Sequence, residues 1–257
     1  MLKAALWLAA LPLLASASGL QSVASSSAHP IASVGIIIDD LGNSLRYGRR
    51  AINLPGAVAC AILPHTYFSV RLAEMARAHN KEVILHLPMA STDGEEPGPG
   101  NLDSNMPALE VAMTLAYDLQ TVPHAVGISN HMGSLLTQQR EPMQLLMKAI
   151  ANRGDLFFVD SLTTADSVAG HAARQLGVPH LVRNIFLDNV REVEAIDRQF
   201  DKLVAIARER NRVLAIGHPY PETLEVLERR LPDLANNGIE LVSLSKLLEL
   251  QSQATIQ

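Results

Sequence analysis

The chain has 257 residues, of which 48% are apolar and 18% are charged, and its formal net charge is −5. This composition suits one α/β domain with a sizeable core and excludes a disordered or fibrous chain. The sequence contains no basic block and no run of interleaved aromatic residues, so nucleic acid is not an expected partner.

The first 17 residues have the pattern of a secretory signal peptide. Lys3 supplies a short basic start, residues 4–14 are apolar, and Ala15-Ser16-Ala17 has the small-x-small form of a cleavage site. We therefore expect an exported, periplasmic protein that keeps no stable membrane span after cleavage. An uncleaved N-terminal anchor is the alternative interpretation.

Composition also suggests how the rest of the chain is divided. Residues 18–30 are rich in Ser and Ala and predict a flexible leader. Residues 31–250 are expected to form a single folded domain, and residues 251–257 a C-terminal tail. The single cysteine, Cys60, excludes a disulfide within the chain.

From residue 31 onward, apolar runs typical of buried strands alternate with segments of helical periodicity. The predicted strands are residues 34–38, 57–63, 82–87, 125–129, 156–159, 181–187, 213–216 and 239–244. The predicted helices are residues 46–52, 67–79, 108–119, 141–152, 165–176, 190–210 and 222–231, with a short helix at the C-terminus. Residues 90–105 interrupt this alternation with an acidic, Pro- and Gly-rich stretch that predicts a long loop. The alternation itself predicts a parallel sheet or barrel of βα units.

Polar residues recur at the ends of these apolar strands. Because functional groups collect at the carboxyl ends of parallel strands, we expect several of these residues to share one site. They are Asp39, Asp40, His65, His86, Asn130, His131, Asp160, Asp188 and His218. We leave His65 out of this site and interpret it as a loop residue between Pro64 and Thr66.

The adjacent carboxylates of Asp39 and Asp40 suggest the chemistry of the site. One Asp with two His is a usual ligand set for a catalytic divalent metal that keeps open positions. A second carboxylate can then act as general base on water, and a further His can protonate a leaving group. A receiver-type magnesium site is disfavoured because no Lys follows a late core strand. The plain structural alternative is that one Asp caps the next helix while the other faces solvent.

Five sequence blocks resemble those of the divergent polysaccharide deacetylase family, distant relatives of the NodB-type carbohydrate esterases. The blocks are Ile37-Ile38-Asp39-Asp40-Leu41-Gly42, His86-Leu87-Pro88-Met89, Gly127-Ile128-Ser129-Asn130-His131-Met132-Gly133-Ser134, Phe158-Val159-Asp160-Ser161 and Ala215-Ile216-Gly217-His218-Pro219. The resemblance extends over residues 31–248. It implies a distorted, incomplete (β/α) barrel and metal-dependent hydrolysis of an acetyl group on a sugar.

The resemblance also implies a metal site and a general base. Asp40, His86 and His131 would hold a divalent metal, with zinc as the first expectation, and Asp39 would be the base. The better-known deacetylases place their two metal-binding His four residues apart. Here the fourth residue after His86 is Ala90, so we expect His131 to supply the second imidazole.

The remaining blocks imply further roles by the same resemblance. His218 would be the general acid or oxyanion partner, and Asp160 would orient or tune one of these groups. Asn130 and Ser134 would contact the substrate or position a ligand. The expected reaction is removal of an acetyl group from an amino sugar in a cell-envelope, peptidoglycan-type polysaccharide. Because the usual Arg-Pro-Pro-Tyr type of block is missing, the alternative is a catalytically inactive domain that binds envelope glycan or protein on the same fold.

Overall fold

The computed structural model describes residues 32–255, so the predicted signal peptide and leader lie outside the described residues. The strands are β1 (Ala32–Leu41), β2 (Ala59–Ile62), β3 (Val83–Met89), β4 (Ala125–Met132), β5 (Phe157–Asp160), β6 (His180–Val182), β7 (Ile185–Phe186), β8 (Arg212–Gly217) and β9 (Ile239–Leu241). The helices are α1 (Leu45–Ile52), α2 (Ser69–Ala78), α3 (Ala108–Thr121), α4 (Arg140–Arg153), α5 (Ala169–Gln175), α6 (Val193–Arg210), α7 (Pro221–Arg230) and α8 (Leu244–Thr255). Short 3₁₀ turns lie at Leu136–Gln138, Leu231–Asp233 and Ala235–Asn237.

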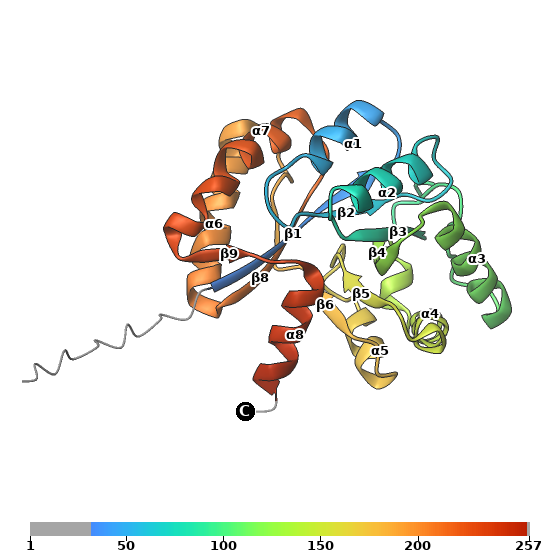
Figure 1. Ribbon diagram of the computed structural model, residues 1–257. Coiled ribbons are helices and arrows are strands. Elements are labelled where there is room, and N and C mark those ends of the chain that lie inside the picture. Colours follow the sequence, from blue (N-terminus) through green and yellow to red (C-terminus); the bar gives the residue numbers. More distant parts are fainter. Residues whose placement is uncertain (1–31, 256–257) are drawn as a thin grey trace, which may run out of the picture.

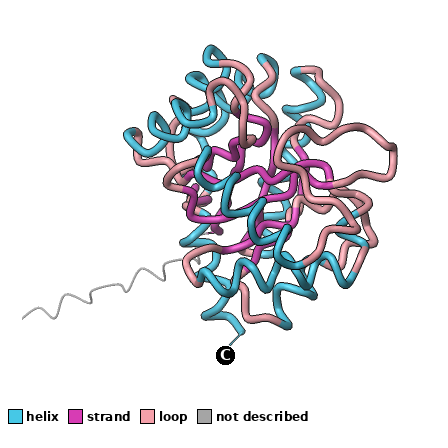
Figure 2. The backbone as a smooth tube through the Cα atoms, turned by 90° about the vertical axis from the view of Figure 1, so that its right-hand side faces the viewer, coloured by secondary structure: helices cyan, strands magenta, loops and turns pink. Residues whose placement is uncertain are grey.

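The strands form one curled parallel sheet with helices around its outer face (Figures 1 and 2). Their order is β6-β5-β4-β3-β2-β1-β8-β7, and β9 pairs with the start of β1. Because β6 and β7 lie at opposite ends of this order, the barrel stays open between them. This is the incomplete (β/α) barrel that we expected.

The open seam corrects our prediction of one strand over residues 181–187. The chain instead pairs β6 with β5, crosses the seam at Arg183 and Asn184, and then pairs β7 with β8. Asn184 reaches β8 through its backbone N–H, which donates to the carbonyl of Leu214 at 2.9 Å, and its Oδ1 accepts the Leu214 N–H at 2.7 Å. Buried apolar residues stand on both sides of the seam, Leu181 before it and Ile185 and Leu187 after it, and this is why the stretch resembled a single strand.

Side chains point alternately to the two faces of each strand, so the apolar residues form two layers. On β1, Ile36 and Ile38 pack in the layer between the sheet and the outer helices, whereas Ile37 packs in a second cluster inside the barrel. That inner cluster includes Leu244 and Leu247 of α8, which therefore covers the amino-terminal end of the barrel. The opposite, carboxyl-terminal end is left for polar side chains.

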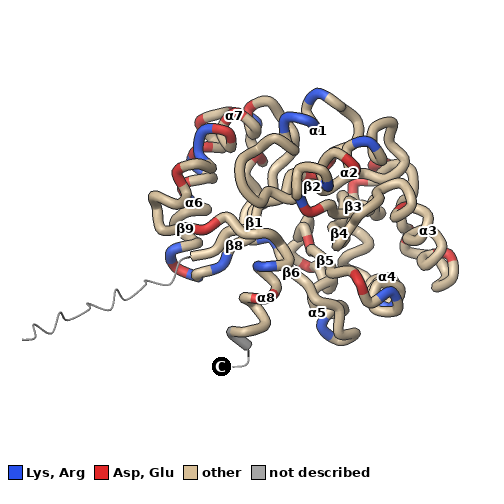
Figure 3. The backbone as a smooth tube through the Cα atoms, in the orientation of Figure 1, with Lys and Arg blue, Asp and Glu red and all other residues tan. Residues whose placement is uncertain are grey.

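The helix α8 runs to Thr255 and so extends past residue 250, where we expected the domain to end and a tail to begin. Acidic and basic residues are mixed over the outer helices rather than gathered by sign (Figure 3). On α6 and α7, for example, Arg230 pairs with Asp197 and Asp201. Among the described residues, no helix combines the length and the apolar character that crossing a membrane requires.

Candidate metal centre and catalytic groups

Three predicted metal ligands meet at the carboxyl end of the sheet. Asp40 Oδ1 lies 2.8 Å from His131 Nδ1 and 3.1 Å from His86 Nε2. The two imidazole nitrogens are 3.3 Å apart. These side chains come from β1, β3 and β4, and His131 lies in register with Pro88 on the neighbouring strand. The second imidazole therefore arrives across the sheet rather than from the segment that carries His86.

The separations between the three donor atoms match those expected around one divalent cation. Ligand atoms about 2.0–2.2 Å from a metal, at angles of about 90–110°, lie about 2.8–3.6 Å apart, which brackets all three separations. Asp40 Oδ1 is also buried without a hydrogen bond among the described residues. A carboxylate with two imidazoles is a usual donor set for a divalent metal, and here Asp40 and His131 are partly exposed while His86 is buried.

Ser129 holds the first imidazole in place. Its hydroxyl lies 2.7 Å from His86 Nδ1, and both side chains are buried. If Nδ1 donates this hydrogen bond, the lone pair of Nε2 faces Asp40 and is available to a metal. Ser129 was not predicted as a site residue, although it lies in the block that contains His131.

A distorted strand end directs the Asp40 carboxylate toward the imidazoles. The pairing of β1 with β2 shifts register between Ile38 and Leu41, and Asp40 itself has φ of 57°. This left-handed conformation is tolerated by Asp more readily than by most residues. Burial alone would raise the pKa of Asp40, but its contacts with His131 and His86 hold that pKa well below the usual value. The carboxylate is therefore ionised, as a metal ligand must be.

Asp39 lies beside the ligand set but is not part of it. Its Oδ2 is 3.7 Å from His86 Nε2, and its Oδ1 is buried with no hydrogen bond among the described residues. Burial raises the pKa of Asp39 despite the opposing influence of His86 and His218. A carboxylate with a raised pKa and a free lone pair is a stronger base than an ordinary Asp.

His218 lies on the other side of Asp40 and is held by a buried carboxylate. Its Nε2 is 3.9 Å from Asp40 Oδ2, while its Nδ1 lies 2.9 Å from Asp188 Oδ1. The His218 backbone N–H and the Thr223 hydroxyl both donate to Asp188 Oδ2, at 2.6 and 2.8 Å. Burial alone would lower the pKa of His218, but Asp188, with Asp40 and Asp39, raises it to about 9. The imidazole is therefore protonated at neutral pH and able to donate a proton from Nε2.

Asp160 does not join this group. Its two oxygens accept hydrogen bonds from the Leu162 N–H at 2.8 Å and the Ser167 hydroxyl at 2.7 Å, which fixes the turn after β5. The carboxylate that contacts His218 is Asp188, which lies just after β7 and to which we had given no role. Strand parity explains the difference, because Phe158 packs toward the helices, and Asp160, two residues on, points the same way.

The two predicted substrate contacts tie loops together in this structure. Asn130 is buried, accepts the Ser161 N–H at 2.8 Å and donates to the Met132 carbonyl at 2.8 Å. The Ser134 hydroxyl accepts the Thr92 N–H at 3.0 Å, which attaches the 90–105 loop to the end of β4. Both residues therefore hold the loops beside the site in place.

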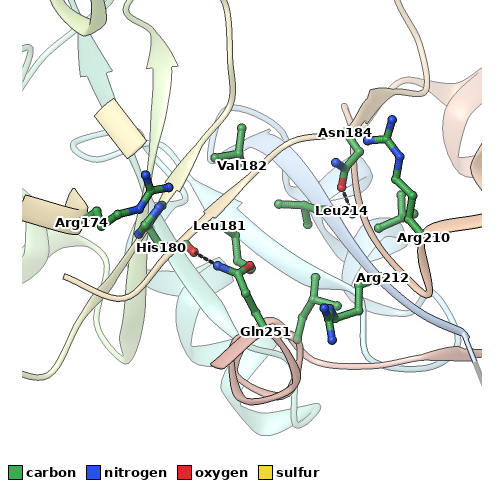
Figure 4. Close-up of a pocket in the computed structure, with 11 residues that line it drawn as sticks. Arg174, His180, Leu181, Val182, Asn184, Arg210, Arg212, Leu214 and Gln251 are labelled. Atoms are coloured by element: carbon green, nitrogen blue, oxygen red, sulfur yellow. Dashed lines mark hydrogen bonds between the residues drawn. The ribbon is translucent and has the colours of Figure 1, made fainter. Parts of the chain in front are cut away.

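One cavity lies away from this chemistry (Figure 4). It has a volume of about 320 Å³ and lies toward the amino ends of β6 and β8. Arg174 and His180 stand on one side of it and Arg210 and Arg212 on the other, with Leu181 and Leu214 between them (Figure 4). None of the predicted site residues lines it.

The profile of the family described as divergent polysaccharide deacetylase matches residues 36–248. An uncharacterized Escherichia coli K12 protein, YibQ, is 34% identical over 215 residues, which are 84% of this chain and 67% of that protein. The description of this relative gives no activity.

Two solved structures extend the comparison to the fold. An uncharacterized protein from Agrobacterium tumefaciens C58 aligns with a TM-score of 0.80 at 25% identity, over 84% of this chain and 89% of that one. A CE4-family pseudoenzyme from Bacillus anthracis aligns at 0.51 with 14% identity, over 86% and 66% of the two chains. The curled sheet, the five blocks and the match over most of the chain agree, and this chain belongs to the divergent polysaccharide deacetylase family.

Proposed function

We propose that this protein is a metal-dependent hydrolase that removes an acetyl group from an amino sugar in cell-envelope polysaccharide, after export to the periplasm. The observation that carries the proposal is that a complete ligand triad, a free buried carboxylate and a protonated imidazole lie around one point. The triad is Asp40, His86 and His131, and the flanking groups are Asp39 and His218. The family supplies the substrate class.

The residues divide the reaction between them. A divalent metal, with zinc the first candidate, supplies Lewis-acid chemistry that activates water and polarises a carbonyl. Asp39 accepts a proton from the attacking water as the water oxygen bonds to the acetyl carbon. His218 then donates its Nε2 proton to the sugar nitrogen as the carbon–nitrogen bond breaks. The products are acetate and a free amino sugar, and Asp188 stabilises the imidazolium before transfer.

The alternative is a binding domain that keeps the fold without turnover. It is supported by the missing Arg-Pro-Pro-Tyr block and by the fact that one structural neighbour is a pseudoenzyme. A mutant of that pseudoenzyme has restored enzymatic activity, so the fold itself is compatible with both outcomes. The Asp39 and His218 positions favour the hydrolase for this chain.

The first experiment measures metal content and acetate release together. The mature protein is purified, reconstituted with zinc and assayed on N-acetylglucosamine oligomers, beside Asp40→Ala, His86→Ala and His131→Ala. We expect near-stoichiometric metal in wild type and its loss in each variant. His65→Ala, which removes an imidazole paired with a different Asp, is the matched control and should retain metal.

The outcomes separate the proposals. Metal that is retained in one variant removes that residue from the ligand set. Metal without acetate release, on N- and O-acetylated glycans alike, favours the binding domain. Wild-type protein that takes up no metal after reconstitution overturns the hydrolase.

A further inference from the structure

A second cavity opens directly beside the candidate centre. It has a volume of about 310 Å³, and Asp40 forms part of its wall together with Ser44, Tyr47, Arg191 and Tyr220. Arg191 is the only Lys or Arg among the residues that line it. A group that occupied this cavity would therefore contact a metal ligand at one end and a guanidinium at another.

Stacking holds the Arg191 guanidinium in a defined orientation. Its central carbon lies 3.8 Å from the centroid of the Tyr220 ring. The Tyr220 ring stacks in turn on His218, with centroids 5.3 Å apart and an interplanar angle of 30°. A guanidinium that lies over an aromatic face uses its face for the contact and keeps its edge N–H donors free.

Those donors have no close carboxylate in the described chain. The nearest is Glu222 Oε2, which is 3.9 Å from Arg191 and therefore beyond hydrogen-bond distance. By contrast, Arg50 makes two bonds of 2.6 and 2.8 Å to Glu228. Glu222 Oε2 is itself buried without a hydrogen bond among the described residues. Arg191 is thus positioned but not neutralised by a close ion pair.

We propose that this cavity is a substrate subsite for a carboxylate, and that Arg191 binds it through the edge of its guanidinium. The inference rests on the proposed function and narrows its substrate to an acetylated amino-sugar polymer that carries carboxylate groups. The planar edge of Arg matches a carboxylate with two parallel hydrogen bonds. A neutral sugar in the same place leaves the guanidinium paired only with water.

The test compares two glycans of equal length. One is the neutral N-acetylglucosamine tetramer; in the other, alternate sugars bear a lactyl ether carboxylate. Affinity is measured by calorimetry on the zinc-loaded mature chain, and acetate release is measured in parallel. We expect the acidic tetramer to bind about tenfold more tightly, the size of one charge-assisted contact. Arg191→Gln should remove this preference, so that the two tetramers bind with similar affinity.

Two further variants fix the interpretation. Glu222→Gln removes the one carboxylate of the described chain that lies within 4 Å of the guanidinium, and it should strengthen binding of the acidic tetramer a few-fold. Arg198→Gln changes the net charge equally, at an exposed position on α6 outside the cavity, and should change neither affinity. Equal loss in Arg198→Gln and Arg191→Gln would mean that only overall charge matters and would overturn the subsite.

Activity separates this inference from the proposed function. If both tetramers are deacetylated and Arg191→Gln treats them as wild type does, the subsite is wrong while the hydrolase stands. If the acidic tetramer binds through Arg191 but releases no acetate, the subsite stands while the hydrolase is wrong. If neither tetramer binds, the subsite is overturned.

Discussion

Two His–Asp pairs lie outside the metal triad, and they differ in the number of hydrogen bonds that the carboxylate accepts. His218 pairs with Asp188 at 2.9 Å, and His65 pairs with Asp118 at 2.7 Å. Both carboxylates are buried. The difference lies in the other hydrogen bonds that each carboxylate receives.

Asp188 accepts additional bonds from the His218 backbone and Thr223, so its charge is well stabilised and raises the pKa of His218 to about 9. Asp118 Oδ2 has no hydrogen bond among the described residues, and burial raises the pKa of Asp118 to about 6. A fully satisfied carboxylate thus tunes its imidazole, whereas an incompletely satisfied one is itself perturbed.

Position assigns the two pairs different roles. His218 faces Asp40, whereas His65 stacks on Tyr117 with ring centroids 4.6 Å apart. A Cβ atom added at Gly100 would overlap Asp118 Oδ1, so the 90–105 loop packs directly on this second pair. The second pair therefore fastens a loop, and a His beside an Asp is not by itself a sign of catalysis.

The largest effect is expected from Asp188→Asn. Without the carboxylate, the pKa of His218 falls, so less of the imidazole is protonated at neutral pH. We expect acetate release to fall by about 10²–10⁴-fold, the usual contribution of a positioned acid. The basic limb of the pH–rate profile should also move to lower pH. Asp118→Asn is the matched control, and an equal loss of activity there would contradict the assignment.

A pH-dependent effect on stability is expected from Asp118→Asn. The raised folded pKa of Asp118 contributes stability that is present below its unfolded value near 3.8 and is lost as pH rises through about 6. Asn does not titrate, so the variant should gain up to about 3 kcal/mol relative to wild type between pH 4 and pH 7. Urea unfolding at the two pH values measures this, and a His65→Gln background removes the titration of the imidazole. A pH-independent difference would show that Asp118 is not perturbed.

A smaller effect is expected from Thr223→Val. This nearly isosteric change removes one donor to Asp188 and should lower the free energy of unfolding by about 1–2 kcal/mol. Acetate release should also fall, but less than in Asp188→Asn. Thr121→Val is the matched change beside the other pair, where the hydroxyl bonds to the backbone of His65 and Asp118. Thr121→Val should leave acetate release unchanged. If acetate release fell equally in both Thr variants, the two pairs would not differ in role.

The alternation of side chains along each strand predicts part of the site from the sequence. Ile37, Ile84 and Ile216 all pack inside the barrel, so Asp39, His86 and His218, each two residues further on, face the same interior. Asp160 was expected in the site because it follows a strand and lies in a matching block, but its parity directs it toward the helices. Applied in advance, the period-2 rule would have excluded Asp160 and pointed to Ser129.

Asp40 breaks the same rule. Parity places it on the helix side with Ile38, and only the positive φ and the register shift of β1 turn its carboxylate inward. Asp188 was equally hard to assign, because it follows β7, whose place at the sheet edge depends on the seam at Asn184. Local patterns do not encode either feature.

The sequence by itself determined the alternation of strands and helices, the incomplete barrel and the residue types of the centre, because burial periodicity and block order are local properties of the chain. The tertiary structure decided which carboxylate holds His218, that His131 meets His86 across adjacent strands, and that Arg191 lies over Tyr220. These contacts join residues far apart in the chain, and their geometry depends on strand register, a bulge and the open seam. Such features are set by the packing of the whole sheet, which no single segment specifies.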